Sequence, residues 1–458
     1  MTPRNQGQAR LCLVAGVLIF FAALLRYWMP YDPALSFHRN PEMFSLAYNL
    51  AQNGQFANPF ARLLTGPSAH LAPAVPGFLA LLVKVFGAGG SGMRAVEIAS
   101  AISVSLLLAL FPLMSALLGM GPLNGVLAAF FWIIAKVEIN LGSEGFYAAL
   151  LVAAACCCYR LLLDAEPPSV ARLSLLLGRL IGVSLLVIPS IAPVFAVCIV
   201  WEMWRKRLDF FKGPALALVL LPALIVTPWL IRNYMVFHRI FFVRDDLGLE
   251  LQVSNNDCAQ FGQSANNNSG CFYKFHPNVN PAEAQKVLEL GETRYNDLKL
   301  IEAKDWIKAH PAQFARLTAM RFIVFWVPND SGKIFFWMPP PVVKTDFADP
   351  GLVQAMGPAL PGNDTRRVRE WLVIYLMTLL SVAGLVMLYK RDMKSTAILV
   401  SCLIFFPLIY YFVQFDGRYR YPILWITFLL GSLPISTLLA YSLAPFRVRS
   451  STKLAARI

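Results

Sequence analysis

Long apolar runs, separated by polar segments of unequal length, recur along most of the chain. A helix needs about 20 mostly apolar residues to cross the hydrocarbon core of a membrane, because an unpaired backbone group costs several kcal/mol there. Pro189 and Pro193 interrupt the fifth and sixth runs, which are short. Ten runs approach the required length, and we predict a spanning helix in each: residues 11–29, 97–119, 123–139, 146–164, 173–188, 189–205, 214–231, 370–389, 395–413 and 421–443.

Two wide polar intervals separate these runs, residues 30–96 and residues 232–369. In the first, residues 42–52 have the spacing of an amphipathic helix on the membrane surface. The apolar run 76–86 is too short to cross, so we expect it to be interfacial or re-entrant. In the second interval, residues 281–310 carry Glu, Lys and Leu at helical spacing, which predicts one or two amphipathic helices.

These patterns predict an all-α polytopic membrane protein with about ten transmembrane helices and a small subdomain on the outer, non-cytoplasmic side. We divide the chain into three parts: an N-terminal transmembrane module, residues 1–231, which contains the first outer loop; a large periplasmic or lumenal loop, residues 232–369; and a C-terminal transmembrane module, residues 370–458.

The composition agrees with this topology, since 57% of the residues are hydrophobic and only 14% are charged. The net charge of +14 could suggest a nucleic-acid partner. However, basic clusters such as 205–207 and 390–394 fall at alternate ends of the predicted spans, which is the pattern of cytoplasmic loops. We therefore expect membrane lipids, and no nucleic acid, as partners of the protein. We expect it to lie in a bacterial inner membrane with both termini in the cytoplasm.

Eight cysteines are present, and six of them lie in apolar runs, where a thiol behaves as a small hydrophobe. Cys258 and Cys271 lie instead in the large outer loop, in and just after an Asn-rich stretch. Disulfides persist in extracytoplasmic compartments, so we expect these two residues to form one.

Two carboxylates and three arginines at the outer membrane face are candidates for chemistry. Glu42 and Glu144 converge on that face, although each could simply be an acid at a helix start. A phosphate at the membrane surface would need fixed cations, which Arg232, Arg418 and Arg420 could supply. The alternative is that these arginines are snorkelling anchors or pair with a neighbouring carboxylate.

The five histidines do not have the spacing of metal ligands, and no phosphate-binding Gly-rich loop is present, which disfavours a nucleotide-linked donor. We predict no certain cofactor and leave a divalent cation open.

Several segments resemble the polyprenyl-phosphate-sugar-dependent glycosyltransferases of the GT-C fold, the superfamily of protein mannosyltransferases and aminoarabinose transferases, glycosyltransferase family 39-like. The likeness spans nearly the whole chain and rests on segments that occur in the family's order: 42–56, 65–77, 84–87, 227–234, 254–256, 291–292, 303–307, 310–311, 325–326 and 417–422.

The resemblance implies an undecaprenyl- or dolichyl-phosphate-linked sugar donor and inversion at the anomeric carbon. The family's base is a first-loop carboxylate, commonly Asp. Here the matching stretch, residues 38–42, lacks that Asp, and Glu42 takes its place. Glu144 resembles the family's second acidic residue. We assign Arg232, Arg418, Arg420 and His70 to donor binding.

The expected function is transfer of a sugar from the lipid carrier to a hydroxyl of a protein, lipid or glycan on the non-cytoplasmic face. Two alternatives remain open. A flippase or transporter of lipid-linked sugar would share the head group, although no matching halves are visible in the sequence. A catalytically inactive scaffold would keep the fold, and the missing Asp keeps this interpretation open.

Overall fold

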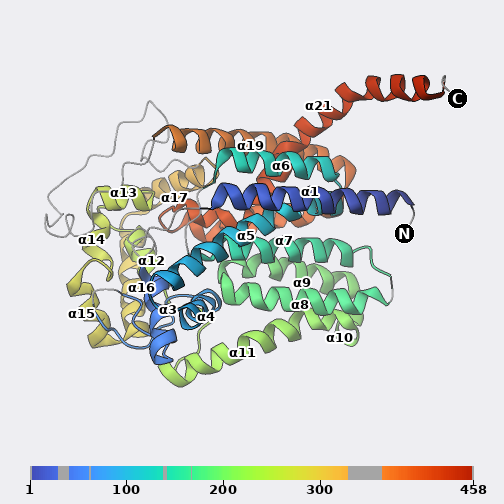
Figure 1. The fold of residues 1–458 in the computed structure, drawn as a ribbon. Helices are drawn as coiled ribbons and strands as arrows, with labels where there is room; N and C mark the ends of the chain where they lie inside the picture. Colours follow the sequence, from blue (N-terminus) through green and yellow to red (C-terminus); the bar gives the residue numbers. More distant parts are fainter. Residues whose placement is uncertain are drawn as a thin grey trace.

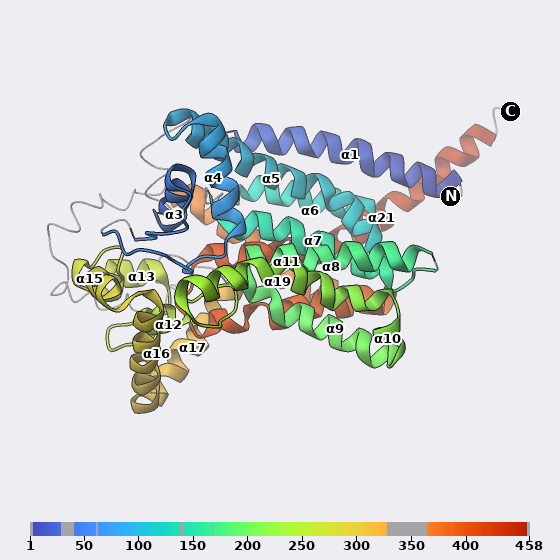
Figure 2. The ribbon, with the colours of Figure 1, turned by 90° about the horizontal axis from the view of Figure 1, so that it is seen from below.

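The computed structural model describes residues 3–28, 41–60, 63–137, 142–166, 168–327 and 364–455, and these ranges are mostly helical. They contain isolated β-bridges but no strand of a sheet. Long helices form a bundle, and the short helices of the two predicted outer loops, hereafter the first and the large outer loop, cover one end of it (Figures 1 and 2). The start of α1 (Pro3–Tyr27) and the end of α21 (Tyr421–Ala455) both lie at the opposite end.

Eight helices among the described residues are long and apolar enough to cross a membrane, and they correspond to eight of the ten predicted runs. Six of them are α1, α5 (Gly90–Leu117), α7 (Glu144–Leu162), α8 (Ser169–Val187), α11 (Ala217–Phe237) with the short η2 (Pro214–Leu216), and α19 (Asp364–Arg391). The other two combine α20 (Met393–Phe405) with η4 (Pro407–Tyr411), and η5 (Gly417–Arg420) with α21. The chain is therefore a polytopic all-α membrane protein.

The two remaining predicted spans form shorter helices. The run 123–139 contains α6 (Pro122–Ala135, 14 residues), which ends where Lys136 adopts a left-handed conformation. The run 189–205 is divided between η1 (Pro189–Ile191) and α9 (Ala192–Lys206, 15 residues). Neither reaches the length of a straight crossing, so the count of ten stays a prediction.

Close helix contacts hold the bundle together. A Cβ atom on Gly384 of α19 would lie 1.9 Å from the carbonyl oxygen of Leu430 in α21, and one on Gly431 would lie 2.4 Å from that of Met377. Only glycine therefore permits this approach of the two backbones, as is common between membrane helices. The buried core also contains aromatic side chains, including Phe111, Trp132, Trp425 and Phe428.

The outer loops are also helical. The predicted helix 42–52 is confirmed as α3 (Pro41–Asn53), and the short apolar run forms α4 (Ala74–Phe86). The segment 281–310 forms two helices, α15 (Pro281–Leu290) and α16 (Glu292–Ala309), and Asn280 caps the first by accepting the N–H groups of Ala282 and Glu283. Residues 30–40 and 328–363 of the predicted outer loops, and residue 29 at the end of the first predicted span, lie outside the described ranges. The remaining helices are α10 (Asp209–Lys212), α12 (Leu247–Ser254), α13 (Gln263–Asn268), α14 (Cys271–Phe275) and α17 (Pro311–Trp326).

Candidate active site

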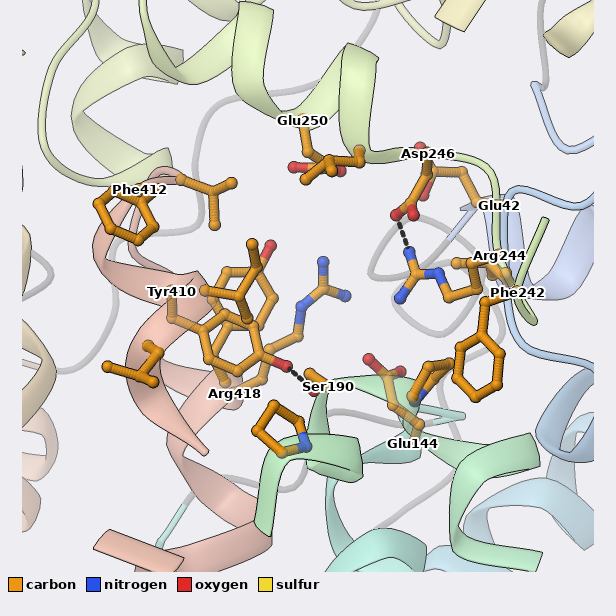
Figure 3. A pocket seen from close by; sticks show the side chains of 18 of the residues that line it. Glu42, Glu144, Ser190, Phe242, Arg244, Asp246, Glu250, Tyr410, Phe412 and Arg418 are labelled. Carbon is orange, nitrogen blue, oxygen red and sulfur yellow. Dashed lines mark hydrogen bonds and ion pairs between the residues drawn. The ribbon is translucent and has the colours of Figure 1, made fainter. Parts of the chain in front are cut away.

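A cavity of about 510 Å³ lies where the first outer loop, the start of α7 and the large outer loop meet the end of α20 and η5 (Figure 3). One part of its lining is apolar: Pro189, Pro193, Phe405, Leu408, Ile409, Phe412 and Val413. Another part is charged: Glu42, Glu144, Arg244, Asp246, Glu250 and Arg418. A cavity of this composition can take a ligand that joins a charged head to an apolar chain.

Glu42 lies in the first turn of α3 and is held by both outer loops. Its Oε2 atom is 3.3 Å from Nε2 of His70, and its Oε1 atom is 3.4 Å from Nε2 of His276. The side-chain amide of Asn278 donates to Oε1 at 2.5 Å. The apolar face of α3 is buried and fixes this position through Met43, Phe44, Leu46 and Ala47.

The first outer loop is tied to the large outer loop beside His70. The Ala69 N–H donates to the Glu292 carboxylate at 2.5 Å, and the Ala69 carbonyl accepts the Asp245 N–H at 3.0 Å. These bonds place the imidazole of His70, which is 1% exposed, next to Glu42.

The protonation states around Glu42 follow from its neighbours. Burial acts to raise the pKa of Glu42, but His70, His276 and Arg418 outweigh it and lower the pKa to about 2. Burial acts to lower the pKa of His70, yet Glu42 raises it to about 9. Burial lowers the pKa of His276 to about 4. At neutral pH the site thus holds an ionised Glu42–His70 pair beside a neutral His276.

Glu144 and Glu250 differ from Glu42 in having no hydrogen-bond or ion-pair partner within the described parts of the chain. Glu144 begins α7, whose cap is the hydroxyl of Ser143, which accepts the Gly145 N–H. Glu250 lies on α12. The two side chains point into the cavity from opposite sides (Figure 3). Burial, with the nearby charge of Asp246, raises the pKa of Glu250 to about 7.

Two arginines face one another across the cavity (Figure 3). Arg244 bonds to the Asp246 carboxylate and donates through Nε to the His70 carbonyl at 2.9 Å. Arg418 pairs through Nε with Oδ2 of Asp416 at 3.2 Å. Nη1 of Arg244 and both Nη atoms of Arg418 bond to none of the described residues, so these donors are open to an anion between the two guanidinium groups.

Arg232 and Arg420 lie outside the cavity lining. Arg232 donates to the carbonyls of Ser68 at 2.8 Å and Phe56 at 2.9 Å, which secures the first outer loop. Arg420 is 2% exposed and donates to the Trp326 carbonyl at 2.9 Å and to the Thr378 hydroxyl at 2.7 Å. Both therefore bond mainly to the protein itself.

Of the residues selected from the sequence, the structure brings Glu42, Glu144 and Arg418 to the cavity, whereas His70 is buried outside the lining and reaches the site through its contact with Glu42. Sequence reasoning missed Arg244, Asp246 and Glu250, which also line it, and the two residues that hold Glu42 from the large loop, His276 and Asn278. The charged run 244–246 could have been found by the rule already applied to Glu42, since it closely follows a predicted span.

Cys258 and Cys271 are joined by a disulfide, with their Cα atoms 5.7 Å apart. The bond links the segment after α12 to the start of α14 and so closes the part of the large outer loop that contains α13. Among the described residues, no three or more His, Cys, Asp or Glu side chains are grouped as a metal site, and the divalent cation stays an open prediction.

Neither family models nor curated proteins match this chain. Three solved structures from Archaeoglobus fulgidus do match in fold. The archaeal oligosaccharyltransferase AglB, in complex with an inhibitory peptide and a dolichol-phosphate, is 14% identical, with a TM-score of 0.53. The A. fulgidus oligosaccharyltransferase is 16% identical in its apo form, with a TM-score of 0.54, and 15% identical with Zn and sulfate, with a TM-score of 0.51.

These matches cover 96% of this chain but only 51–52% of the archaeal chains, so the protein spans about half their length. At such low identity the likeness concerns the fold alone. The chain thus has a GT-C-like fold, the architecture that the sequence resemblance implied.

Proposed function

We propose that this protein is an inverting membrane glycosyltransferase that takes its sugar from a polyprenyl-phosphate carrier. The observation that carries the proposal is the cavity, in which two guanidinium groups with open donors lie beside an apolar wall within the fold of an oligosaccharyltransferase. The dolichol-phosphate bound to the archaeal oligosaccharyltransferase AglB supports a lipid-phosphate donor here.

Arg244 and Arg418 are the residues that we propose for the donor phosphate. Charge-assisted hydrogen bonds from both would stabilise the negative charge that develops on the phosphate as the sugar leaves. The apolar wall between η1 and η4 would hold the first isoprene units of the carrier. Arg232 and Arg420, selected from the sequence for this role, would instead position the first outer loop and the start of α21.

Glu42 as the base stays a prediction. Its carboxylate lines the cavity and is ionised, as a base must be, while a pKa of about 2 makes it a weak base near neutral pH. Glu144, opposite, would contact the sugar or the acceptor. The acceptor would be a hydroxyl of a protein, lipid or glycan at the non-cytoplasmic face of a bacterial inner membrane, with the termini in the cytoplasm.

Reconstitution tests the proposal against its alternatives. Proteoliposomes with the purified chain, a radiolabelled polyprenyl-phosphate sugar and a cell-envelope extract should yield labelled acceptor and free polyprenyl phosphate. A flippase would move the labelled lipid between leaflets without releasing polyprenyl phosphate. An inactive scaffold would bind polyprenyl phosphate and release nothing. Either of these results would replace the glycosyltransferase proposal.

A further inference from the structure

The position of Glu250 is fixed by the packing of α12 on α16. A Cβ atom on Gly248 would lie 1.9 Å from the Asn296 carbonyl oxygen, so the two helices are in backbone contact there. The Leu249 N–H donates to the Asn296 side chain at 3.1 Å. Leu249 and Val253 are buried in the core of the outer loop. The large loop therefore holds the Glu250 side chain toward the cavity (Figure 3).

The four cavity carboxylates fall into two classes. Glu42 has three partners and Asp246 bonds to Arg244, so the oxygens of both carboxylates are already engaged by the protein. Glu144 and Glu250 have none among the residues that the structure describes. A group that exchanges a proton with a substrate must be free to hydrogen-bond to it, and Glu144 and Glu250 meet this condition.

We propose that Glu250 accepts the proton of the acceptor hydroxyl during sugar transfer, an assignment that rests on the proposed function. The acceptor oxygen forms a bond to the anomeric carbon while the bond from that carbon to the phosphate oxygen breaks. The electron pair of the broken bond leaves with the lipid phosphate. The hydroxyl proton moves to the Glu250 carboxylate and later passes to water.

The charges that face Glu250 distinguish it from Glu42 as a base. Burial and two nearby carboxylates favour the protonated form, while the two cations on the first outer loop and on the segment before α12 oppose them. The resulting pKa of about 7 gives a strong base that is ionised above neutral pH. The facing groups are Glu42 and His70 of the first outer loop, Arg244 and Asp246 before α12, and Tyr419 of η5.

The test compares transfer as a function of pH, from about pH 5 to about pH 9. In the wild type, kcat/KM should rise with pH through about 7, because the base is ionised only above the pKa of Glu250. Glu250→Gln should lose transfer by about 10²–10⁴-fold and still bind polyprenyl phosphate. Glu250→Asp should recover part of the rate. It should also keep the acidic limb of the profile, which is the fall in kcat/KM as the pH is lowered below the pKa of the base.

Two controls separate this role from a loss of structure or of charge. Glu289→Gln changes an exposed carboxylate of α15, outside the cavity, and should leave the profile unchanged. Glu144→Gln removes the other unpartnered cavity carboxylate and should lower the rate without moving the acidic limb. Formation of the Cys258–Cys271 disulfide reports on whether the large outer loop, which also contains α12 and Glu250, has folded.

Each result has one meaning. Transfer by Glu250→Gln at the wild-type rate, with the acidic limb intact, would overturn the assignment of Glu250 alone. A wild-type rate that does not change between about pH 5 and about pH 8 would also overturn it and would favour Glu42 as the base. Absence of any transfer by the wild type would instead refute the glycosyltransferase itself. If Glu250→Gln does not form the disulfide, Glu250→Asp replaces it in the test. An acidic limb in Glu250→Asp supports Glu250 as the base, and its absence overturns the assignment.

Discussion

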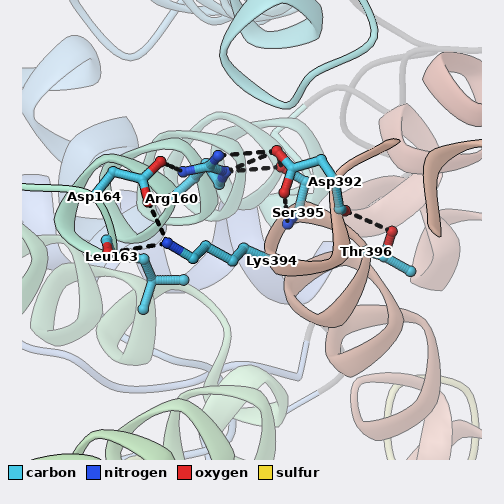
Figure 4. Close-up of polar contacts among 7 residues, drawn as sticks. All are labelled: Arg160, Leu163, Asp164, Asp392, Lys394, Ser395 and Thr396. Atoms are coloured by element: carbon cyan, nitrogen blue, oxygen red, sulfur yellow. Dashed lines mark hydrogen bonds and ion pairs between the residues drawn. The ribbon is translucent and has the colours of Figure 1, made fainter. Parts of the chain in front are cut away.

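The two ends of α7 both carry charged side chains, but the charges are used differently. Glu144 begins the helix and Arg160 lies in its last turn, about 24 Å away at 1.5 Å per residue. Around Arg160 every charge has a partner (Figure 4), whereas Glu144 faces the cavity with none among the described residues (Figure 3).

The cluster at Arg160 joins α7 to α20. Arg160 donates through Nε to Asp392 at 3.0 Å and also pairs with Asp164. Lys394 bonds to Asp164 from the other side, and Asp392 caps α20 by accepting the Ser395 N–H at 3.1 Å. This cluster is saturated with its own partners, which is the property of a structural contact. The cavity has open donors and open carboxylates, which is the property of a binding or catalytic site.

Among the variants that compare the cavity with the Arg160 cluster, we expect the largest loss of transfer from Glu42→Gln. This change removes the carboxylate that both outer loops hold. Transfer should fall by about 10²–10⁴-fold, whether Glu42 is the base or fixes the charge around it. The rate is measured with the reconstituted protein and a polyprenyl-phosphate sugar. Asp305→Asn, at a side chain that is 66% exposed on α16, is the matched control. Unchanged transfer by Glu42→Gln would exclude Glu42 as the base.

Arg418→Gln should reduce transfer by about 10²–10³-fold, because an open donor to the leaving phosphate is lost. Affinity for polyprenyl phosphate, measured by the quenching of tryptophan fluorescence, should fall with it. Arg316→Gln removes an exposed arginine of α17 and should change neither quantity. If Arg418→Gln binds polyprenyl phosphate as tightly as the wild type, the phosphate is held elsewhere.

The spans and part of the cavity could be predicted because they depend on local signals. A carboxylate or arginine beside an apolar run is conspicuous, and this rule found Glu42, Glu144 and Arg418. The same rule also selected Arg232 and Arg420, since a sequence does not show that backbone carbonyls will satisfy their donors. Glu250 could not be found in this way, because it faces the cavity only through the packing of α12 on α16.

Arg160→Gln should have the opposite profile to the cavity variants. Removing this guanidinium leaves the Asp392 and Asp164 carboxylates short of a donor and should lower the free energy of unfolding by about 1–3 kcal/mol. The transfer rate of the folded protein should stay near that of the wild type. Thermal unfolding in detergent and the transfer assay measure the two quantities. A loss of rate without a loss of stability would refute the interpretation that the Arg160 end of α7 is structural and the Glu144 end is functional.

The smallest expected effect comes from the ion pair between Glu42 and His70. Because the pKa of His70 is raised from 6.5 to about 9 in the folded chain, the pair contributes its full stability below 6.5. That contribution declines as the pH rises and is lost above about 9, since the unfolded chain releases its proton first. Glu250 also destabilises the fold on ionising, but its pKa of about 7 places that loss at lower pH.

Unfolding temperatures compared at about pH 7.5 and about pH 9.5 therefore isolate His70 from Glu250. The wild type should lose stability over this interval, and His70→Gln should lose less, because it has no imidazolium to neutralise. His310→Gln, at an exposed histidine after α16, should behave as the wild type. An equal loss in His70→Gln would mean that Glu42 is not held by a charged imidazole. The carboxylate would then lack its main stabilising charge, its pKa would lie nearer the ordinary range, and Glu42 would regain the strength as a base that the pair removes.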